Sequence, residues 1–79
     1  MKTIMKNIRR SKLYKEMTSY DACAIAEGFC GYEPAQNQLQ AAWQYIVDTG
    51  LYRQLQGWYG RTAADLIDNG VILTPLTSS

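Results

Sequence analysis

The sequence predicts an all-α protein, a compact bundle of four to five short helices with a basic N-terminal arm or helix. Apolar residues recur at the 3.6-residue spacing of a helix in the longest patterned stretch, residues 35–50. Capping residues and glycines divide the rest of the chain into short segments, and no stretch shows the Val- and Thr-rich alternation of a β-strand. We expect a helical domain over residues 18–73, a basic segment over 1–17 and a flexible tail over 74–79.

Residues 1–17 carry most of the positive charge. The cations that precede the first acid are Lys2, Lys6, Arg9, Arg10, Lys12 and Lys15. From Glu16 onward the chain holds all seven of its acids and only two further cations, Arg53 and Arg61. Apolar residues recur loosely through the basic segment, so we expect either a short amphipathic helix or an arm that orders only against a partner. This asymmetry suits nucleic-acid contact, self-association or docking on an acidic protein surface.

The first helix of the body is expected from Tyr20 to Glu27. The hydroxyl of Thr18 can accept a hydrogen bond from the backbone N–H three residues later, at Asp21, as in a capping box. Gly28 is expected to end the helix, because glycine adopts the left-handed conformation of a helix C-terminus without steric cost.

A longer helix is predicted to begin with Pro34 and to end at Gly50. Proline suits the first helical position, where its missing N–H costs nothing. The expected core face consists of Leu39, Ala42, Trp43, Ile46 and Val47. Tyr45 should point roughly the opposite way. The residues expected to keep the remaining surface polar and almost uncharged are Gln36, Gln38, Gln40 and Gln44.

An apolar stripe continues from Leu51 to Tyr59 and indicates another short helix. Gly57 and Gly60 bracket Trp58 and Tyr59, and we expect these glycines to break the helix because glycine disfavours helix interiors. Trp58 and Tyr59 should therefore occupy a corner, with one side chain directed inward and the other outward.

The last helix is expected from Ala63 to about Asn69, with Thr62 as its cap and Gly70 as its stop. After the stop, residues 71–73 are apolar and should lie on the core.

Several kinds of function lack their characteristic residues. The chain has no histidine, so the commonest general base and metal ligand are missing. Cys23 and Cys30 do not have the spacing of a zinc site, and we expect buried free thiols, with a disulfide as the alternative. We expect no enzyme activity and no catalytic, cofactor-binding or metal site. No apolar stretch is long enough for a signal peptide or a membrane span, which predicts a soluble intracellular protein.

The nine aromatic residues are the main positive signal. A 79-residue domain can bury only some of them, and Tyr and Trp left on a surface are typical of protein interfaces. Trp43 is assigned to the core. The candidate partner-binding residues are Tyr45, Tyr52, Arg53, Trp58, Tyr59 and Arg61. The excess of aromatic side chains over core capacity also predicts a homodimer.

About two thirds of the chain, from Tyr20 to Ile72, resembles a family of very small proteins encoded by tailed bacteriophages. The residues that carry this resemblance are Tyr20, Ala22, Glu27–Gly28, Ala42–Tyr45, Asp48–Gly50, Gln54–Trp58, Gly60–Arg61, Ala63 and Gly70. The basic segment lies outside it. In size and character the chain is also similar to a small vibriophage inhibitor of the bacterial defence system BREX.

The resemblance implies a non-enzymatic, homodimeric inhibitor in the cytoplasm of the host cell. Its implied partner is BrxC, the large AAA+-type ATPase of BREX, whose assembly or DNA engagement it would block. The alternative, which follows from the charge distribution, is a small nucleic-acid-binding early regulator that uses the basic N-terminal arm.

Overall fold

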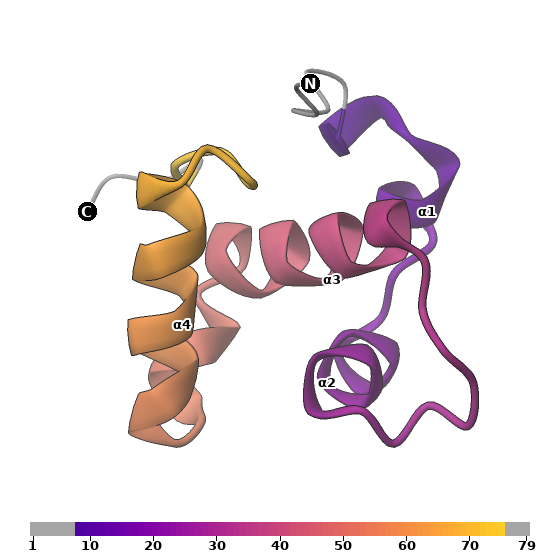
Figure 1. The fold of residues 1–79 in the computed structure, drawn as a ribbon, viewed down its shortest axis with the longest axis horizontal. Coiled ribbons are helices and arrows are strands. Elements are labelled where there is room, and N and C mark those ends of the chain that lie inside the picture. Colours follow the sequence, from indigo (N-terminus) through magenta and orange to yellow (C-terminus); the bar gives the residue numbers. More distant parts are fainter. Residues whose placement is uncertain (1–7, 76–79) are drawn as a thin grey trace.

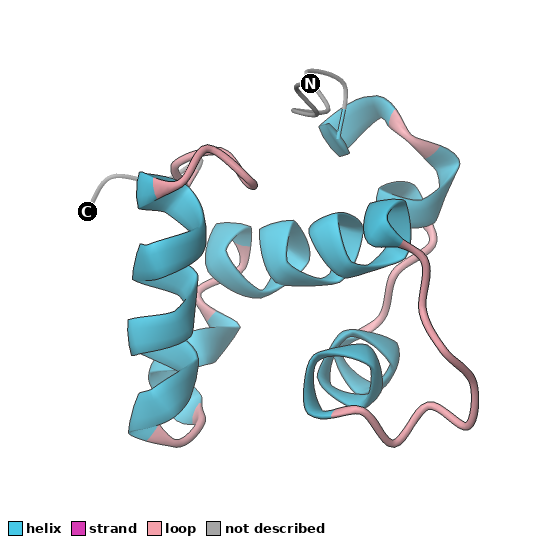
Figure 2. Cartoon of the chain, in the orientation of Figure 1, coloured by secondary structure: helices cyan, strands magenta, loops and turns pink. Residues whose placement is uncertain are grey.

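A computed structural model describes residues 8–75 of the chain, and this part is all-α (Figures 1 and 2). Its elements are the 3-10 helix η1 (Ile8–Arg10), α1 (Lys12–Lys15), α2 (Ser19–Glu27), α3 (Gln36–Asp48), the 3-10 helix η2 (Leu51–Gln54) and α4 (Gly57–Asp68). No strand occurs among the described residues. The predicted fold class is confirmed.

Helix α3 is the central element. In Figure 1, α4 lies on one side of it, and α1 and α2 lie on another. Helix α3 contacts η1, α1, α2 and η2, so it is covered on more than one face. Its buried apolar residues are Ala41, Ala42, Trp43, Ile46 and Val47, joined in the core by Ala22, Ile25, Tyr59, Ala63 and Ile72. The predicted core position of Trp43 is confirmed, since its exposed fraction is 5%.

The cap that begins helix α2 and the glycine that ends it are those predicted. Thr18 is the N-cap, and its Oγ1 accepts a hydrogen bond of 3.1 Å from the backbone N–H of Asp21. Gly28 ends the helix with a φ of 83°, in the left-handed region that glycine enters without strain. Gly50 and Gly70 take the same conformation after α3 and α4, with φ values of 75° and 74°.

The predicted start of α3 at Pro34 is wrong. The N-cap is Ala35, and the helix begins at Gln36. The side-chain carbonyl of Gln38 accepts a hydrogen bond of 2.8 Å from the backbone N–H of Ala35, which satisfies a donor that the helix itself leaves free. This bond places the cap one residue after the proline, which lies outside the helix.

The predicted break between Gly57 and Gly60 is also wrong, because α4 runs without interruption from Gly57 to Asp68. Each glycine costs a helix only about 1 kcal/mol relative to alanine, and packing of the helix exceeds this cost. Tyr59, between the two glycines, is almost fully buried. Packing does not require a glycine at position 60, since an added Cβ would lie in ordinary contact, 3.8 Å from Cδ2 of Tyr52. Thr62 is therefore an interior helical residue and not a cap.

Gln40 and Gln44 do not belong to a polar surface, which corrects the expectation for the glutamines of α3. Their exposed fractions are 3% and 0%. Gln44 Nε2 donates to the carbonyl of Leu73 at 3.1 Å, and the N–H of Leu73 donates back to Gln44 Oε1 at 2.7 Å. Gln40 Nε2 donates to the carbonyl of Val71 at 3.0 Å. The two amides thus replace the backbone partners that the C-terminal segment lacks.

The basic segment is partly integrated into the body. Ile8 is fully buried, and η1 and α1 pack on α3. Ser11 caps α1 by accepting a hydrogen bond of 3.2 Å from the N–H of Tyr14. Lys2 and Lys6 lie outside the described residues, as does the part of the expected flexible tail after Pro75. The described remainder of the arm is helical and ordered against the protein's own α3.

Candidate functional site

The structure corrects one of the six predicted partner-binding residues. Tyr59 is 1% exposed, with its ring centroid 4.2 Å from that of Trp58 and 5.7 Å from that of Trp43. Its hydroxyl donates a hydrogen bond to Glu27 Oε2. Burial, followed by this hydrogen bond, raises the pKa of Tyr59. The side chain joins α4 to α2 and is not available to a partner.

The other predicted aromatic residues are half-buried. Trp58 packs edge-on against Trp43 with centroids 6.1 Å apart, and Tyr45 packs edge-on against Tyr14 with centroids 6.4 Å apart. Tyr52 lies beneath the guanidinium of Arg53, which is 5.7 Å from the ring centroid. Much of their surface is thus occupied within the fold.

Arg53 and Arg61 are exposed.

The most exposed large apolar side chains are three that the sequence analysis did not select. Tyr20 is 71% exposed, Phe29 52% and Tyr32 53%. We call these three residues the aromatic face. Tyr20 and Phe29 pack edge-on with centroids 6.2 Å apart, and all three line one shallow hollow of about 110 Å³. They lie together although they are separated by up to twelve positions.

A glycine-rich loop builds the aromatic face. Gly28 and Gly31 have φ values of 83° and 92°, so the chain reverses directly after α2 and carries Phe29 back towards Tyr20. The thiol of Cys30 donates to the carbonyl of Tyr32 at 3.2 Å inside this loop. The available signal in the sequence was the position of Phe29 between two glycines and of Tyr32 between Gly31 and Pro34, where no helical spacing assigns either residue to a core.

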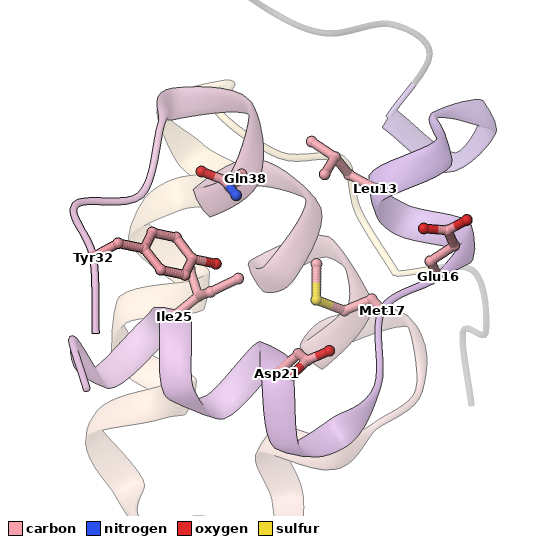
Figure 3. A pocket seen from close by; sticks show the side chains of 7 residues that line it. All are labelled: Leu13, Glu16, Met17, Asp21, Ile25, Tyr32 and Gln38. Carbon is pink, nitrogen blue, oxygen red and sulfur yellow. The ribbon is translucent and has the colours of Figure 1, made fainter. Parts of the chain in front are cut away.

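A second hollow, of about 230 Å³, adjoins the aromatic face (Figure 3). It is lined by Leu13, Glu16, Met17, Asp21, Ile25, Tyr32 and Gln38, and we call it the acidic hollow. Asp21, Ile25 and Tyr32 line both hollows, so the two form one continuous surface. The walls come from α1, the connection after it, α2, the loop before α3 and the first turn of α3.

The carboxylates of the acidic hollow are free to meet a partner. Glu16 and Asp21 are both exposed, and within residues 8–75 neither forms an ion pair. Among those residues no group of three or more His, Cys, Asp or Glu side chains is arranged to hold a metal ion. The arrangement can form hydrogen bonds, ion pairs and aromatic contacts, which are the interactions of a binding surface.

The two cysteines are free. Both Cys23 and Cys30 are half-buried, so the expectation of buried thiols holds only in part.

Arg9 serves the fold, although it belongs to the predicted basic arm. Its Nε and Nη2 donate to the two oxygens of Asp48, and Nη2 also donates to the carbonyl of Thr74. The hydrogen bond to Asp48 is the main cause that raises the pKa of Arg9. Arg10, Lys12 and Lys15 remain exposed.

In the part of the chain that is described, no helix combines the length and the apolar character needed to cross a bilayer. Family models, curated proteins and solved structures were compared with this chain, and none matches it.

Proposed function

We propose that this protein is a non-enzymatic, phage-encoded inhibitor that binds a protein of a bacterial anti-phage defence in the host cytoplasm. The observation that carries the proposal is the aromatic face: Tyr20, Phe29 and Tyr32 are at least half exposed and lie together on a very small protein. Aromatic side chains are concentrated at the centres of protein interfaces. The similarity in size and character to a vibriophage inhibitor of BREX supplies the candidate target, the ATPase BrxC.

A protein fits this face better than a small ligand does. Sites for small molecules are enclosed and bury most of the ligand. The aromatic face instead surrounds a small open hollow of about 110 Å³, beside a larger one of about 230 Å³. Exposed rings around shallow depressions suit the side chains of a partner surface, which would cover the rings and exclude water from them.

The homodimer stays part of the proposal, with a different surface from the aromatic face. The half-buried residues Tyr52 and Trp58, together with exposed Arg53 and Arg61, lie on η2 and α4. Figure 1 shows α4 near the opposite end of α3 from α2. A dimer formed through η2 and α4 would leave both copies of the aromatic face open to BrxC. Sedimentation at micromolar concentration, compared between the wild type and Trp58→Ser, tests this arrangement.

Binding and phage restriction test the proposal directly. Tyr20→Ser and Phe29→Ser should each weaken binding to purified BrxC by roughly thirty-fold, as expected of hot-spot residues. Both side chains are more than half exposed, so the fold should survive. Asp65→Asn is the control, because Asp65 is exposed on α4 and belongs neither to the aromatic face nor to the predicted partner-binding residues. Wild-type protein should restore plaque formation in BREX-positive bacteria, and the two serine variants should not.

The alternative is a nucleic-acid-binding regulator, and one observation favours it: Arg10, Lys12 and Lys15 are exposed within one short segment. DNA affinity that falls steeply with salt, with a slope reduced in the double variant Lys12→Gln/Lys15→Gln, would support this reading. If restriction is undiminished and no ATPase co-purifies, the inhibitor proposal fails and the nucleic-acid reading replaces it.

A further inference from the structure

We infer that the acidic hollow receives an arginine side chain of the partner protein. This inference rests on the proposed function and specifies the chemistry of the partner. The occupant is a segment that lies across the aromatic face and inserts one arginine between Glu16, Asp21 and Tyr32. Because Tyr32 lines both hollows, a single segment can contact the rings and fill the acidic hollow at the same time.

The walls of the acidic hollow match the parts of an arginine side chain. Leu13, Met17 and Ile25 provide apolar surface for the three methylene groups. Tyr32 provides a half-exposed ring on which a guanidinium can stack. Figure 3 shows its hydroxyl directed into the hollow from the loop, while Met17 and the carboxylate of Asp21 lie on the opposite wall.

The charges decide against an apolar occupant. Covering Glu16 and Asp21 with an apolar side chain would remove water from two carboxylates without supplying a donor, which is costly. A cation instead replaces the lost water and forms charge-assisted hydrogen bonds. Within residues 8–75 no ion pair competes for either carboxylate.

Arginine fits better than lysine because the two carboxylates come from different segments. Glu16 is the C-cap of α1, and Asp21 lies in the first turn of α2. A guanidinium carries five donors in a planar fork and can also stack on an aromatic ring, so it can use more than one wall of the hollow. An ammonium is compact and strongly hydrated, so it gains less from the ring and from two separated acceptors.

The acidic hollow is formed before the partner arrives. The N–H of Glu16 donates to the carbonyl of Lys12 at 3.0 Å, and the N–H of Met17 donates to the carbonyl of Tyr14 at 3.1 Å. The N–H of Asp21 is held by Thr18 Oγ1. Fixing the backbone of both acids in this way lowers the ordering cost of binding.

A titration of the isotopically labelled full chain with N-acetyl-arginine amide tests the hollow without any partner. Backbone amide shifts in the nuclear magnetic resonance spectrum should change and saturate at Glu16, Asp21 and Tyr32. N-acetyl-citrulline amide, the uncharged isostere, and N-acetyl-lysine amide should produce much smaller changes. The double variant Glu16→Gln/Asp21→Asn should lose the response, while Asp65→Asn, an exposed acid on α4, should keep it. An equal response to arginine, citrulline and lysine, or an unchanged response in the double variant, overturns the inference.

Binding to BrxC separates the inference from the proposed function. Glu16→Gln/Asp21→Asn should weaken BrxC binding by about ten-fold or more and should reduce its salt dependence. Asp65→Asn should leave the affinity unchanged. If BrxC does not bind the wild type, the proposed function fails, and the arginine titration still decides the chemistry of the hollow. If BrxC binds both variants as it binds the wild type, the proposed function stands and the arginine inference is wrong.

Discussion

Arg9 and Asp48, 39 positions apart, form a two-point ion pair: Nε lies 2.7 Å from Oδ2 and Nη2 lies 2.9 Å from Oδ1. The Asp48 side chain is 2% exposed and also accepts bonds from Tyr14 Oη at 2.8 Å and Gln44 Nε2 at 3.2 Å. One carboxylate at the end of α3 therefore holds both the basic segment and the residue that docks the C-terminal segment.

The two partners of this pair should respond unequally to substitution. Arg9→Met leaves a buried carboxylate without its cation and should cost about 3 kcal/mol in the free energy of unfolding. Asp48→Asn should cost about 1–2 kcal/mol, because the Arg9 side chain is 26% exposed and can regain water. Urea unfolding measures both values. A larger cost for Asp48→Asn would contradict this account of the pair.

Trp43→Ala should destabilise the protein by about 3–5 kcal/mol, because it removes a 5%-exposed ring that packs on Trp58 and Tyr59. Tyr20→Ala is the control, since a 71%-exposed side chain contributes little to the core. Thermal melting of both variants separates the roles. A melting temperature for Trp43→Ala close to that of the wild type would contradict the stabilising role assigned to Trp43 in the core.

Alkaline pH should weaken the fold through Tyr14. Burial, and then the hydrogen bond to Asp48, raises the pKa of Tyr14 from 10.0 to about 12. The folded state thus holds the phenolic proton more tightly than the unfolded state. The associated stability, on the order of 2 kcal/mol, is fully present below pH 10 and is lost as the pH rises towards about 12.

Unfolding free energies of the wild type and Tyr14→Phe, measured across this pH range, isolate the effect from other titrating groups. The difference between the two proteins should shrink as the pH rises. A constant difference would show that the Tyr14 proton is not linked to folding.

Gln44→Ala should release the C-terminal segment from α3. It removes both hydrogen bonds to the backbone of Leu73 and should cost about 2–3 kcal/mol. Amide hydrogen exchange gives the sharper measurement, because the N–H of Leu73 donates to Gln44 Oε1. Its exchange should accelerate more than that of the Asn69 amide, which bonds the carbonyl of Asp65 inside the last turn of α4. Equal acceleration at both amides would indicate global unfolding instead.

Gly60→Ala should stabilise the protein by about 0.5–1 kcal/mol, because Gly60 lies inside α4 and an added Cβ makes an ordinary contact of 3.8 Å with Tyr52. Gly28→Ala is the matched control and should destabilise the protein, since its φ of 83° strains any residue with a side chain. Chemical denaturation compares them. Destabilisation by Gly60→Ala would show that the contact with Tyr52 does not tolerate the added methyl group.

Most of the local structure was predictable because it depends on neighbouring residues. The cap at Thr18 and the stops at Gly28, Gly50 and Gly70 follow from backbone chemistry that a few residues decide. The core position of Trp43 follows from helical periodicity. The misplaced start at Pro34 is a small error of the same kind, since the bond from Ala35 to Gln38 competes with the preference of proline.

The candidate site was mostly not predictable, because exposure depends on contacts between distant segments. Tyr59 is buried, and its hydroxyl donates a hydrogen bond to Glu27, 32 positions away. The chain reverses at Gly28 and brings Phe29 beside the exposed ring of Tyr20. Nothing in the sequence around Tyr20 distinguishes it from other residues in the first turn of a helix. The selection of candidate partner residues by residue type therefore missed the three most exposed large apolar side chains.

Composition and local backbone preference were enough to predict an all-α chain, the principal helix stops and the lack of histidine chemistry, because neither depends on the fold. The burial of individual polar groups and the exposure of individual rings depend instead on contacts between distant segments. Gln44 shows the reason: a glutamine on a helix reads as a surface residue, but a distant backbone segment at Leu73 satisfies its amide and makes burial favourable. Whether a buried polar group finds a hydrogen-bond partner depends on which distant segment packs against it.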